Sequence, residues 1–408
     1  MKFKKSYTLF ISILFGAFIL VAYGCGGKKI NVRDLLNQPI EEAGNLNRSK
    51  KYIKAGITVV YLTGTPYEIG FAHGILCKDE ITNLNRYYWD AYDKLKKTPD
   101  GKWLPLSRSL ERYIPKDYIT EMKGIADGAG IEYDKILFLN TLVTISEHSK
   151  CFAFSFKQTE SNVITVRQID ISNRIPLWKK MILYIIKPQK GYGFAALLNP
   201  GWVSGETGMN EKGITVSENN IHIQQTQWDV MPIDQLSRKL LQYSQSIDDV
   251  GIILRKQKSY PAKLIFTSNK KTASIFEFAN KEIASINMKS GYLAMANHAC
   301  IIPSKNVTSD SRKRLDFANQ FLKENLKGMD IEKAIELVRT PRISRRWNPV
   351  DHNRQSIIFS PATLDFWIAI PPESDYIPAS YGPYVGFNLM QELYGTGHEP
   401  NPESFPAY

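Results

Sequence analysis

Alternating apolar and polar residues on both sides of a short polar run predict a β-hairpin near the middle of the chain. The first flank, residues 151–157, reads Cys-Phe-Ala-Phe-Ser-Phe-Lys, and the second, residues 163–170, reads Val-Ile-Thr-Val-Arg-Gln-Ile-Asp. Alternation with period two is typical of strands. The polar run between them, with Glu160 near its centre, is the expected turn.

The register of this hairpin brings two chemically reactive side chains together. A turn near Glu160 places Arg167 opposite Ala153, and cross-strand neighbours point to one face, so Arg167 becomes a diagonal neighbour of Cys151. A guanidinium beside a thiol favours the thiolate. Asp170, expected just beyond the strand end, is placed to orient the amine or the arginine. A buried free cysteine with a surface arginine is the alternative that spacing leaves open.

The same patterns divide the rest of the chain into a helical block and a strand-rich block. Residues 56–150 are expected to be mostly helical, with one helix that starts at Pro115 and stops at Gly128. Beyond the hairpin, the expected strands cover 194–198, 214–217, 264–267, 273–278, 356–360 and 366–370, and the expected helices cover 234–245 and 310–325. Strand pairs and helix pairs in this order favour two packed sheets with helices on each side.

The first 24 residues predict an export signal, because a lysine-rich start precedes an apolar run too short for a confident membrane span. This leader ends in Ala-Tyr-Gly-Cys, which resembles a bacterial lipoprotein cleavage site with Cys25 as the lipidated residue. The expected location is the periplasmic or outer face of a bacterial membrane. An ordinary cleaved signal and an uncleaved anchor remain alternatives. Residues 25–55 are polar and basic and predict a tether or an early helix.

Composition indicates one large globular protein, since 43% of the 408 residues are hydrophobic and 12% aromatic. The formal net charge of +12 does not indicate a nucleic-acid partner, because no compact Lys/Arg block interleaved with aromatic residues occurs. Attraction to anionic lipids and a solvated basic surface without any partner both remain open.

The cysteines suit a reactive thiol in an oxidising compartment. If Cys25 carries lipid, three others remain and one of them stays unpaired. A bridge from Cys77 to Cys300 would leave Cys151 free to react. The alternative is that all three are reduced and buried.

The hairpin resembles the N-terminal-nucleophile amide hydrolases, in particular the group of penicillin acyltransferase, acid ceramidase, N-acylethanolamine amidase and the bile-salt and penicillin V hydrolases. In that group the chain cuts itself before a cysteine that opens the first strand of a four-layer αββα core, an α+β fold. The resemblance implies cleavage of the Lys150–Cys151 bond, with residues 56–150 as the small subunit and 151–408 as the catalytic core. Lys150 departs from the penicillin acyltransferase, which has glycine there.

Two segments of the helical block resemble the pro-segment of the penicillin acyltransferase branch. Residues 64–74 carry the pattern G-x-P-x-E-x-G-x-x-H-G, and residues 124–130 carry G-I-A-D-G-A-G. We interpret His73 in the first pattern as a structural residue that satisfies backbone groups. Further on, a Gly-Met-Asn-Glu-Lys-Gly turn resembles another family motif, in which Asn210 and Gly213 hold the turn.

Other matches imply further site residues. Asn297, in Ala-Asn-His, resembles the family's active-site asparagine, and its amide is the candidate oxyanion donor, with a cap as the alternative. The stretch from Ser309 to Arg314 resembles the family's S-x-x-R helix start, and all of it except Arg314 is expected to form an exposed, capped helix end. The strand that follows the Gly-Met-Asn-Glu-Lys-Gly turn ends where family members place a residue that lines the oxyanion site or the acyl pocket. The candidates for that residue are Glu218, Asn219 and Asn220.

The resemblance implies a mechanism without metal or cofactor. The Cys151 thiolate attacks the carbonyl carbon of Lys150, and water then releases the small subunit from the thioester. In the mature enzyme the α-amine of Cys151 is the general base and the same thiol is the nucleophile. The expected substrate is a small linear amide with an apolar acyl group, hydrolysed or transferred to a second amine. The phenylalanines at 152, 154 and 156 are either core or part of an apolar wall.

Two other hypotheses remain. A papain-like hydrolase would pair Cys151 with His148, although His148 would leave with the small subunit. A lipid-anchored binding protein would keep the fold without turnover, because the bulky Lys150 would slow the acyl shift. The spacing of the six histidines does not match a metal site.

Overall fold

Two β-sheets form the centre of the protein. The computed structural model describes residues 41–46, 48–95, 103–145, 149–172, 181–221, 223–304, 307–345, 351–369, 377–398 and 400. The larger sheet has the strand order β1-β2-β3-β6-β7-β8-β9-β10-β11-β12, and the smaller has the order β13-β4-β5-β14-β15-β16. Neighbouring strands pair antiparallel, except that β3 and β6 are parallel.

The bounds of the elements follow the chain. The strands are β1 (Glu41–Leu46), β2 (Ser49–Lys54), β3 (Ile57–Gly64), β4 (Ser149–Thr159), β5 (Asn162–Ser172), β6 (Ile182–Pro188), β7 (Phe194–Leu198), β8 (Thr207–Asn210), β9 (Thr215–Asn220), β10 (Tyr260–Ser268), β11 (Ala273–Asn280), β12 (Glu282–Asn287), β13 (Tyr292–Met295), β14 (Asp351–Ser360), β15 (Asp365–Ala369) and β16 (Tyr384–Asn388). The helices are α3 (Pro66–Leu76), α4 (Lys78–Leu95), α5 (Trp103–Glu111), α6 (Lys116–Ala129), α7 (Tyr133–Leu139), α8 (Leu142–Ile145), α9 (Ile233–Tyr243), α10 (Ile247–Arg255), α11 (Ser309–Asn325), α12 (Ile331–Arg339), α13 (Pro341–Ser344) and α14 (Leu389–Tyr394).

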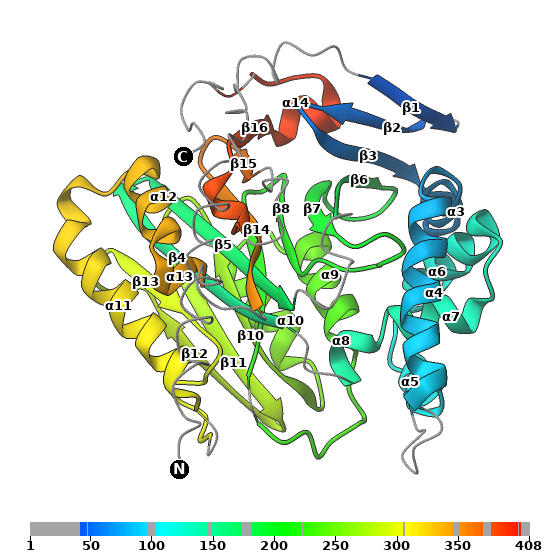
Figure 1. Cartoon of the computed structure of the whole chain (residues 1–408), viewed down its shortest axis with the longest axis horizontal. Coiled ribbons are helices and arrows are strands. Elements are labelled where there is room, and N and C mark those ends of the chain that lie inside the picture. The colour runs from blue at the N-terminus through cyan, green and yellow to red at the C-terminus, as the bar shows by residue number, and fades with distance from the viewer. Residues whose placement is uncertain are drawn as a thin grey trace, which may run out of the picture.

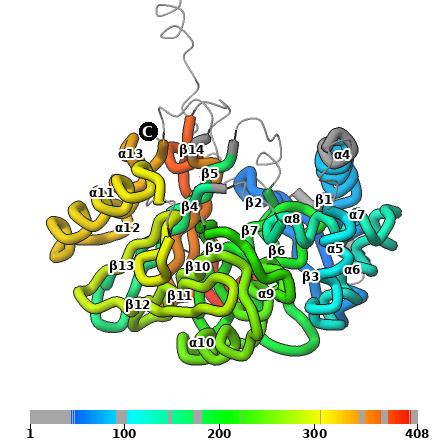
Figure 2. The backbone as a smooth tube through the Cα atoms, turned by 90° about the horizontal axis from the view of Figure 1, so that it is seen from below, coloured from blue at the N-terminus to red at the C-terminus, as the bar shows by residue number. Residues whose placement is uncertain are grey.

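The two sheets and their helices make the four layers of an αββα sandwich, as the resemblance implied. Helices α11 and α12 pack on the outer face of the smaller sheet, and α3, α6, α9 and α10 pack on the outer face of the larger one (Figure 1). In Figure 2, α11 and α12 lie on one side of the strands and α6 lies on the other. The predicted α+β fold is therefore confirmed.

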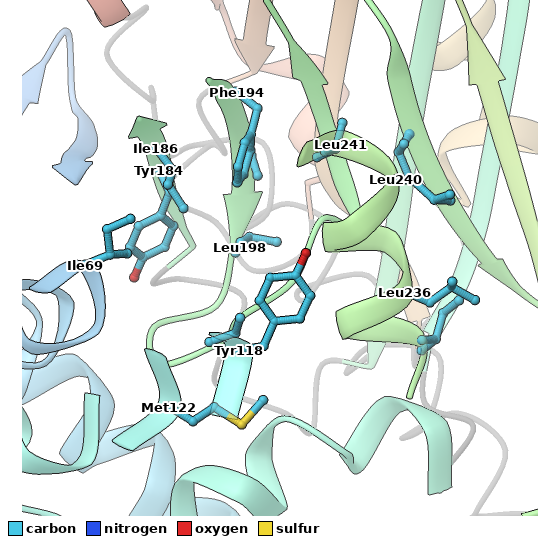
Figure 3. Packing of buried hydrophobic residues seen from close by; sticks show 14 of the residues in the cluster. Ile69, Tyr118, Met122, Tyr184, Ile186, Phe194, Leu198, Leu236, Leu240 and Leu241 are labelled. Carbon is cyan, nitrogen blue, oxygen red and sulfur yellow. The ribbon is translucent and has the colours of Figure 1, made fainter. Parts of the chain in front are cut away.

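Strand β7 shows how alternation builds these layers. Its residues Phe194, Ala196 and Leu198 join the apolar cluster formed with the helices outside the larger sheet, as Figure 3 shows for Phe194 and Leu198. Ala195 and Leu197 face the other way and pack between the sheets. A strand that is buried on both faces reads as a continuous apolar run, which is how the sequence marks it.

The first described residues correct one expectation. The segment 25–55 was predicted to be a tether or an early helix, but its described part contains β1 and β2, which extend the larger sheet. These strands look polar in the sequence because only some positions of β2, such as Ser49 and Tyr52, are buried. The following strand β3 opens the block that was predicted to be mostly helical.

Helices α3 and α6 approach each other closely through glycines. A Cβ atom on Gly70 would lie 1.9 Å from the Glu121 carbonyl oxygen, and one on Gly128 would lie 2.3 Å from the Phe71 carbonyl oxygen. The prediction that Gly128 stops the helix is therefore wrong, because Gly128 serves this contact. The helix is instead capped by Gly130, whose φ of 69° is the left-handed conformation typical of a helix end.

Candidate functional site

The central hairpin has the predicted register. Strands β4 and β5 pair Cys151 with Ile169 and Ala153 with Arg167. Ala153 packs against residues of the larger sheet, so the Cys151 side chain, two residues away, faces the same inter-sheet layer. Cys151 is fully buried there.

The phenylalanines of β4 lie on the opposite face. Phe152, Phe154 and Phe156 pack with α11 and α12 in the core of the smaller sheet's outer layer. Their even numbering places them away from the Cys151 side chain, so they are core residues and the suggested apolar wall beside the thiol is wrong.

Asn297 holds the backbone nitrogen of Cys151. The Cys151 N–H donates to Asn297 Oδ1 at 2.8 Å, and this nitrogen belongs to the Lys150–Cys151 peptide bond. The Asn297 amide group in turn donates to the Asn220 carbonyl oxygen at 3.0 Å. In this geometry Asn297 positions a main-chain nitrogen, and its role as an oxyanion donor stays a prediction.

The Arg167 guanidinium is directed at β9. It donates to Asn219 Oδ1 and to the Glu218 carbonyl oxygen, and it lies 4.0 Å from a Glu206 carboxylate oxygen. The guanidinium is thus fixed in the same inter-sheet layer as Cys151. Its effect on the thiol stays a prediction.

Asp170 differs from its expected place. It lies inside β5, which continues to Ser172, and not beyond the strand end. As an even-numbered residue it faces away from Arg167, so it does not orient that side chain. Its carboxylate forms an ion pair with Arg314 at 2.8 Å and lies 3.9 Å from Arg345. Burial raises the pKa of Asp170, and the two guanidinium groups oppose this rise.

The ion pair of Asp170 and Arg314 lies close to the predicted cleavage bond. Asp170 is the cross-strand partner of Lys150. Arg314 also donates to the Ile343 carbonyl oxygen at 3.2 Å and stacks 5.4 Å from the Phe152 ring centre. The sequence predicted that the basic run around Arg314 would be exposed, with Arg314 itself as the exception. Arg314 is buried because it pairs with the buried Asp170.

The three candidates at the end of β9 have different surroundings. The Asn219 amide donates to the Ala296 carbonyl oxygen at 2.9 Å, next to Asn297. Glu218 forms an ion pair with Lys263 at 3.3 Å. Lys263 also donates to Asn220 Oδ1. Both asparagines therefore contact the segment around Asn297, Asn219 through its side chain and Asn220 through its carbonyl oxygen. The Glu218 carboxylate is instead paired with Lys263.

Lys263 and a group of buried carboxyls were missed by the sequence reasoning. Burial and the neighbouring Glu218 raise the pKa of Glu206 to about 7. Burial and the nearby Glu218 and Glu206 also raise the pKa of Asp234 well above its usual value. The available signal was a charged residue inside an apolar strand, Tyr-Pro-Ala-Lys-Leu-Ile-Phe, because buried charges occur where they are paired.

The other polar candidates have structural roles. The His73 Nε2 atom accepts from the Gly201 N–H at 2.9 Å and lies 2.8 Å from the Tyr184 hydroxyl, and burial lowers the His73 pKa to about 3. Asn210 Oδ1 accepts from two turn N–H groups, and Gly213 has a φ of 75°. The structural interpretation of these three residues is confirmed.

The remaining thiols do not form the suggested bridge. Cys77 and Cys300 are both free. Cys300 is exposed, so the alternative with every thiol buried is also wrong. Burial raises the pKa of Cys77 to about 12, which leaves it as an unreactive thiol at neutral pH.

Several predicted features lie outside the described residues, namely the export signal, Cys25 and His148. Within the described ranges, no helix is both long and apolar enough to cross a bilayer. The described part of the chain also holds no group of three or more His, Cys, Asp or Glu residues arranged for a metal ion.

Residues 158–357 match the family described as acyl-coenzyme A:6-aminopenicillanic acid acyl-transferase. Cys151 lies just before the matched residues. An uncharacterized protein of Archaeoglobus fulgidus is 23% identical over 69% of this chain and 58% of its own. The beta-alanyl-dopamine/carcinine hydrolase of Drosophila melanogaster is 24% identical over 50% of this chain and 58% of its own. The 40 kDa form of acyl-coenzyme A:6-aminopenicillanic-acid-acyltransferase of Emericella nidulans is 24% identical over 59% of this chain and 68% of its own.

The chain spans about half the length of three of the curated relatives that it matches. Among solved structures, an N-acylethanolamine-hydrolyzing acid amidase ortholog of Caenorhabditis elegans is 14% identical, with a TM-score of 0.43 over 55% of this chain and 96% of that chain. A variant of the conjugated bile acid hydrolase of Clostridium perfringens is 8% identical, with a TM-score of 0.41 over 62% of this chain and 98% of that chain.

Proposed function

Because the chain belongs to the acyl-coenzyme A:6-aminopenicillanic acid acyltransferase family, we propose that it is a self-processing cysteine amidohydrolase or acyltransferase. It cleaves its own Lys150–Cys151 bond and then acts on a linear, non-peptide amide through a thioester on Cys151. The observation that carries this proposal is the hydrogen bond from the Cys151 N–H to Asn297 Oδ1, in a buried hairpin of an αββα core.

In the proposed self-cleavage the Cys151 thiol is the nucleophile and the Lys150–Cys151 peptide bond is the bond that breaks. The Cys151 sulfur attacks the carbonyl carbon of Lys150; the C–S bond forms, the C–N bond breaks, and the nitrogen takes up a proton to become the α-amine. Water then hydrolyses the thioester and leaves a carboxylate on Lys150. Asn297 holds the nitrogen during this exchange, and the paired Asp170 lies across from Lys150. Fixed geometry of this kind lowers the barrier by removing orientational freedom.

The proposed turnover repeats the same steps on an external amide. The freed α-amine, with an ordinary pKa of about 8, accepts the thiol proton and later passes it to the leaving amine. Water or a second amine then takes the acyl group from the thioester. The names of two relatives, a carcinine hydrolase and a penicillanic acid acyltransferase, support a small-molecule amide as the substrate.

The N-terminal block is proposed to remain attached as the small subunit. Three contacts between the two parts support this: β3 pairs with β6, His73 accepts from Gly201, and Glu121 forms a buried ion pair with Arg238 at 3.3 Å. We further propose that Cys25 is lipidated after export and anchors the protein to a bacterial membrane, where acyl chains on that residue give stable attachment. Metabolic labelling with a fatty acid should mark the wild type and not Cys25→Ser.

The activity is tested on a panel of N-acyl amines and N-acyl amino acids, with release of the free amine as the measurement. The wild type should release amine from at least one member, and Cys151→Ala should release none. Cys300→Ala is the matched control, because it removes an exposed thiol and should retain full activity. Amine release that survives in Cys151→Ala would contradict the assignment. Absence of release from the wild type across the panel would favour a binding protein that keeps this fold.

A further inference from the structure

Two consecutive asparagines at the end of β9 tie the Asn297 segment to the core. The Asn219 amide donates to the Ala296 carbonyl oxygen, and the Asn297 amide donates to the Asn220 carbonyl oxygen. Each β9 asparagine is itself held by a buried cation at its side-chain oxygen. Arg167 donates to Asn219 Oδ1, and Lys263 donates to Asn220 Oδ1. The place of Asn297, and hence of the Cys151 nitrogen, depends on both cations.

Lys263 also contacts the chain that leads into the cleavage bond. Its ammonium donates to the Val143 carbonyl oxygen at 2.9 Å. Val143 belongs to α8, the last described helix before the Lys150–Cys151 bond. Lys263 is therefore bonded on one side to α8, ahead of the cleavage bond, and on the other to Asn220. The Asn220 carbonyl oxygen in turn accepts from Asn297, the residue that holds the Cys151 nitrogen.

Lys263 has three buried partners. Its ammonium donates to the Val143 carbonyl oxygen and to Asn220 Oδ1, and it forms an ion pair with the Glu218 carboxylate at 3.3 Å. Lys263 is only 3% exposed, and a buried charge is costly without such partners. Glu218 alone would satisfy the charge of Lys263. The two uncharged acceptors, the Val143 carbonyl oxygen and Asn220 Oδ1, fix where the ammonium lies. Through these two hydrogen bonds Lys263 connects α8 to Asn220.

We propose that Lys263 is a positioning residue for self-cleavage at Lys150–Cys151, an inference that rests on the proposed function. It holds Asn220 so that Asn297 keeps the Cys151 nitrogen in place, and it holds α8 so that the preceding chain enters the hairpin at the correct position. Lys263 takes up no proton in the reaction. The bonds that form and break remain the C–S and C–N bonds at the Lys150 carbonyl.

The test measures the first-order rate of cleavage after cell-free synthesis of the full chain is stopped, with the two products resolved on a gel. Lys263→Met should cleave at least tenfold more slowly than the wild type. Lys281→Met is the matched control, because Lys281 is exposed between β11 and β12, and it should cleave at the wild-type rate. A wild-type rate in Lys263→Met would overturn the inference.

A second variant separates positioning from charge compensation. Lys263→Met leaves the Glu218 carboxylate buried without its partner, whereas Lys263→Met/Glu218→Gln removes both charges. If Lys263 positions the bond, the double variant should stay at least tenfold slow while its resistance to urea, measured with Cys151→Ala added, returns toward that of Cys151→Ala. If cleavage in the double variant recovers to the wild-type rate, Lys263 only neutralises Glu218 and the inference is overturned.

If Lys263→Met does not fold, the double variant alone provides the test.

Failure of the proposed function gives a different result from failure of this inference. A folded wild-type chain that never cleaves overturns both, whereas a wild type that cleaves at the same rate as both Lys263 variants overturns only the inference.

Discussion

Removing the partner of the buried Asp170 should destabilise the protein in a way that depends on pH. The carboxylate pairs with Arg314 at 2.8 Å, and a second guanidinium, that of Arg345, lies farther away at 3.9 Å. Arg314→Met leaves this carboxylate with one distant partner in a fully buried site. Breaking a buried pair in this way costs about 3–5 kcal/mol. The folded variant can instead protonate Asp170 and so avoid a buried unpaired charge. From an ordinary pKa of 3.8, this protonation costs about 4 kcal/mol at pH 7.

The stability loss in Arg314→Met should grow as pH rises. In Arg314→Met the folded-state pKa of Asp170 rises further above its unfolded value, so the folded state binds a proton that the unfolded state has lost. Stability therefore falls as pH rises from about 4 through the folded-state pKa. At pH 5 the same protonation costs only about 1.6 kcal/mol. The loss should accordingly be smaller at pH 5 than at pH 7 by up to about 2.7 kcal/mol.

The assay is urea unfolding at both pH values, with Cys151→Ala as the background so that the chain stays uncut. Asp170→Asn/Arg314→Met removes both charges and should recover at least about 1 kcal/mol relative to Arg314→Met at pH 7. Relative to the background, it should not show the fall in stability between pH 5 and pH 7 that Arg314→Met shows, because it has no Asp170 carboxyl to titrate. A loss below about 1 kcal/mol in Arg314→Met, or an equal loss at pH 5 and pH 7, would refute the assignment of a buried ion pair.

Three further predictions concern other buried groups. Burial and Glu218 raise the Glu206 pKa to about 7, so stability should fall as pH rises from about 4.5 to 7, and Glu206→Gln should remove part of that decline in urea titrations. Burial lowers the His73 pKa to about 3, so stability should fall as pH drops from 6.5 toward 3, and His73→Gln should flatten this acid limb. Gly128→Ala should lower the thermal midpoint by several degrees, because its Cβ would meet the Phe71 carbonyl oxygen, whereas Gly328→Ala, which meets nothing within 4 Å, should not.

The hairpin could be predicted in detail because its pattern is local. The polar run between the strands sets the turn, and period two then fixes which residues share a face. The register of Cys151 against Ile169 followed from those two facts. Helix α11 was placed within one residue for a similar reason, since an N-capping residue marks its start.

The partners of the site residues could not be predicted, because they are distant in the sequence. Asp170 was expected near Arg167, but its partner Arg314 lies 144 positions further on, in a run that reads as exposed. The strand end was also placed too early, which hid the fact that Asp170 points to the other face. Lys263 was missed because its pairing with Glu218 and Asn220 exists only once β9 and β10 are adjacent.

The strands at one end of the larger sheet illustrate a second limit. Strand β2 is rich in lysine and looks like a tether, because this strand, second from the end of the sheet, has only some of its positions buried. Its assignment depends on pairing with β3, which composition does not reveal.

Self-cleavage between Lys150 and Cys151 can be measured by intact-mass analysis of the purified wild type and by sequencing of its new N-terminus. We expect two chains that remain associated, with the larger one beginning at Cys151, and a single uncut chain for Cys151→Ala. A wild-type protein that remains one uncut chain and yet releases amine from its substrate would show that Cys151 does not act as a freed N-terminal nucleophile.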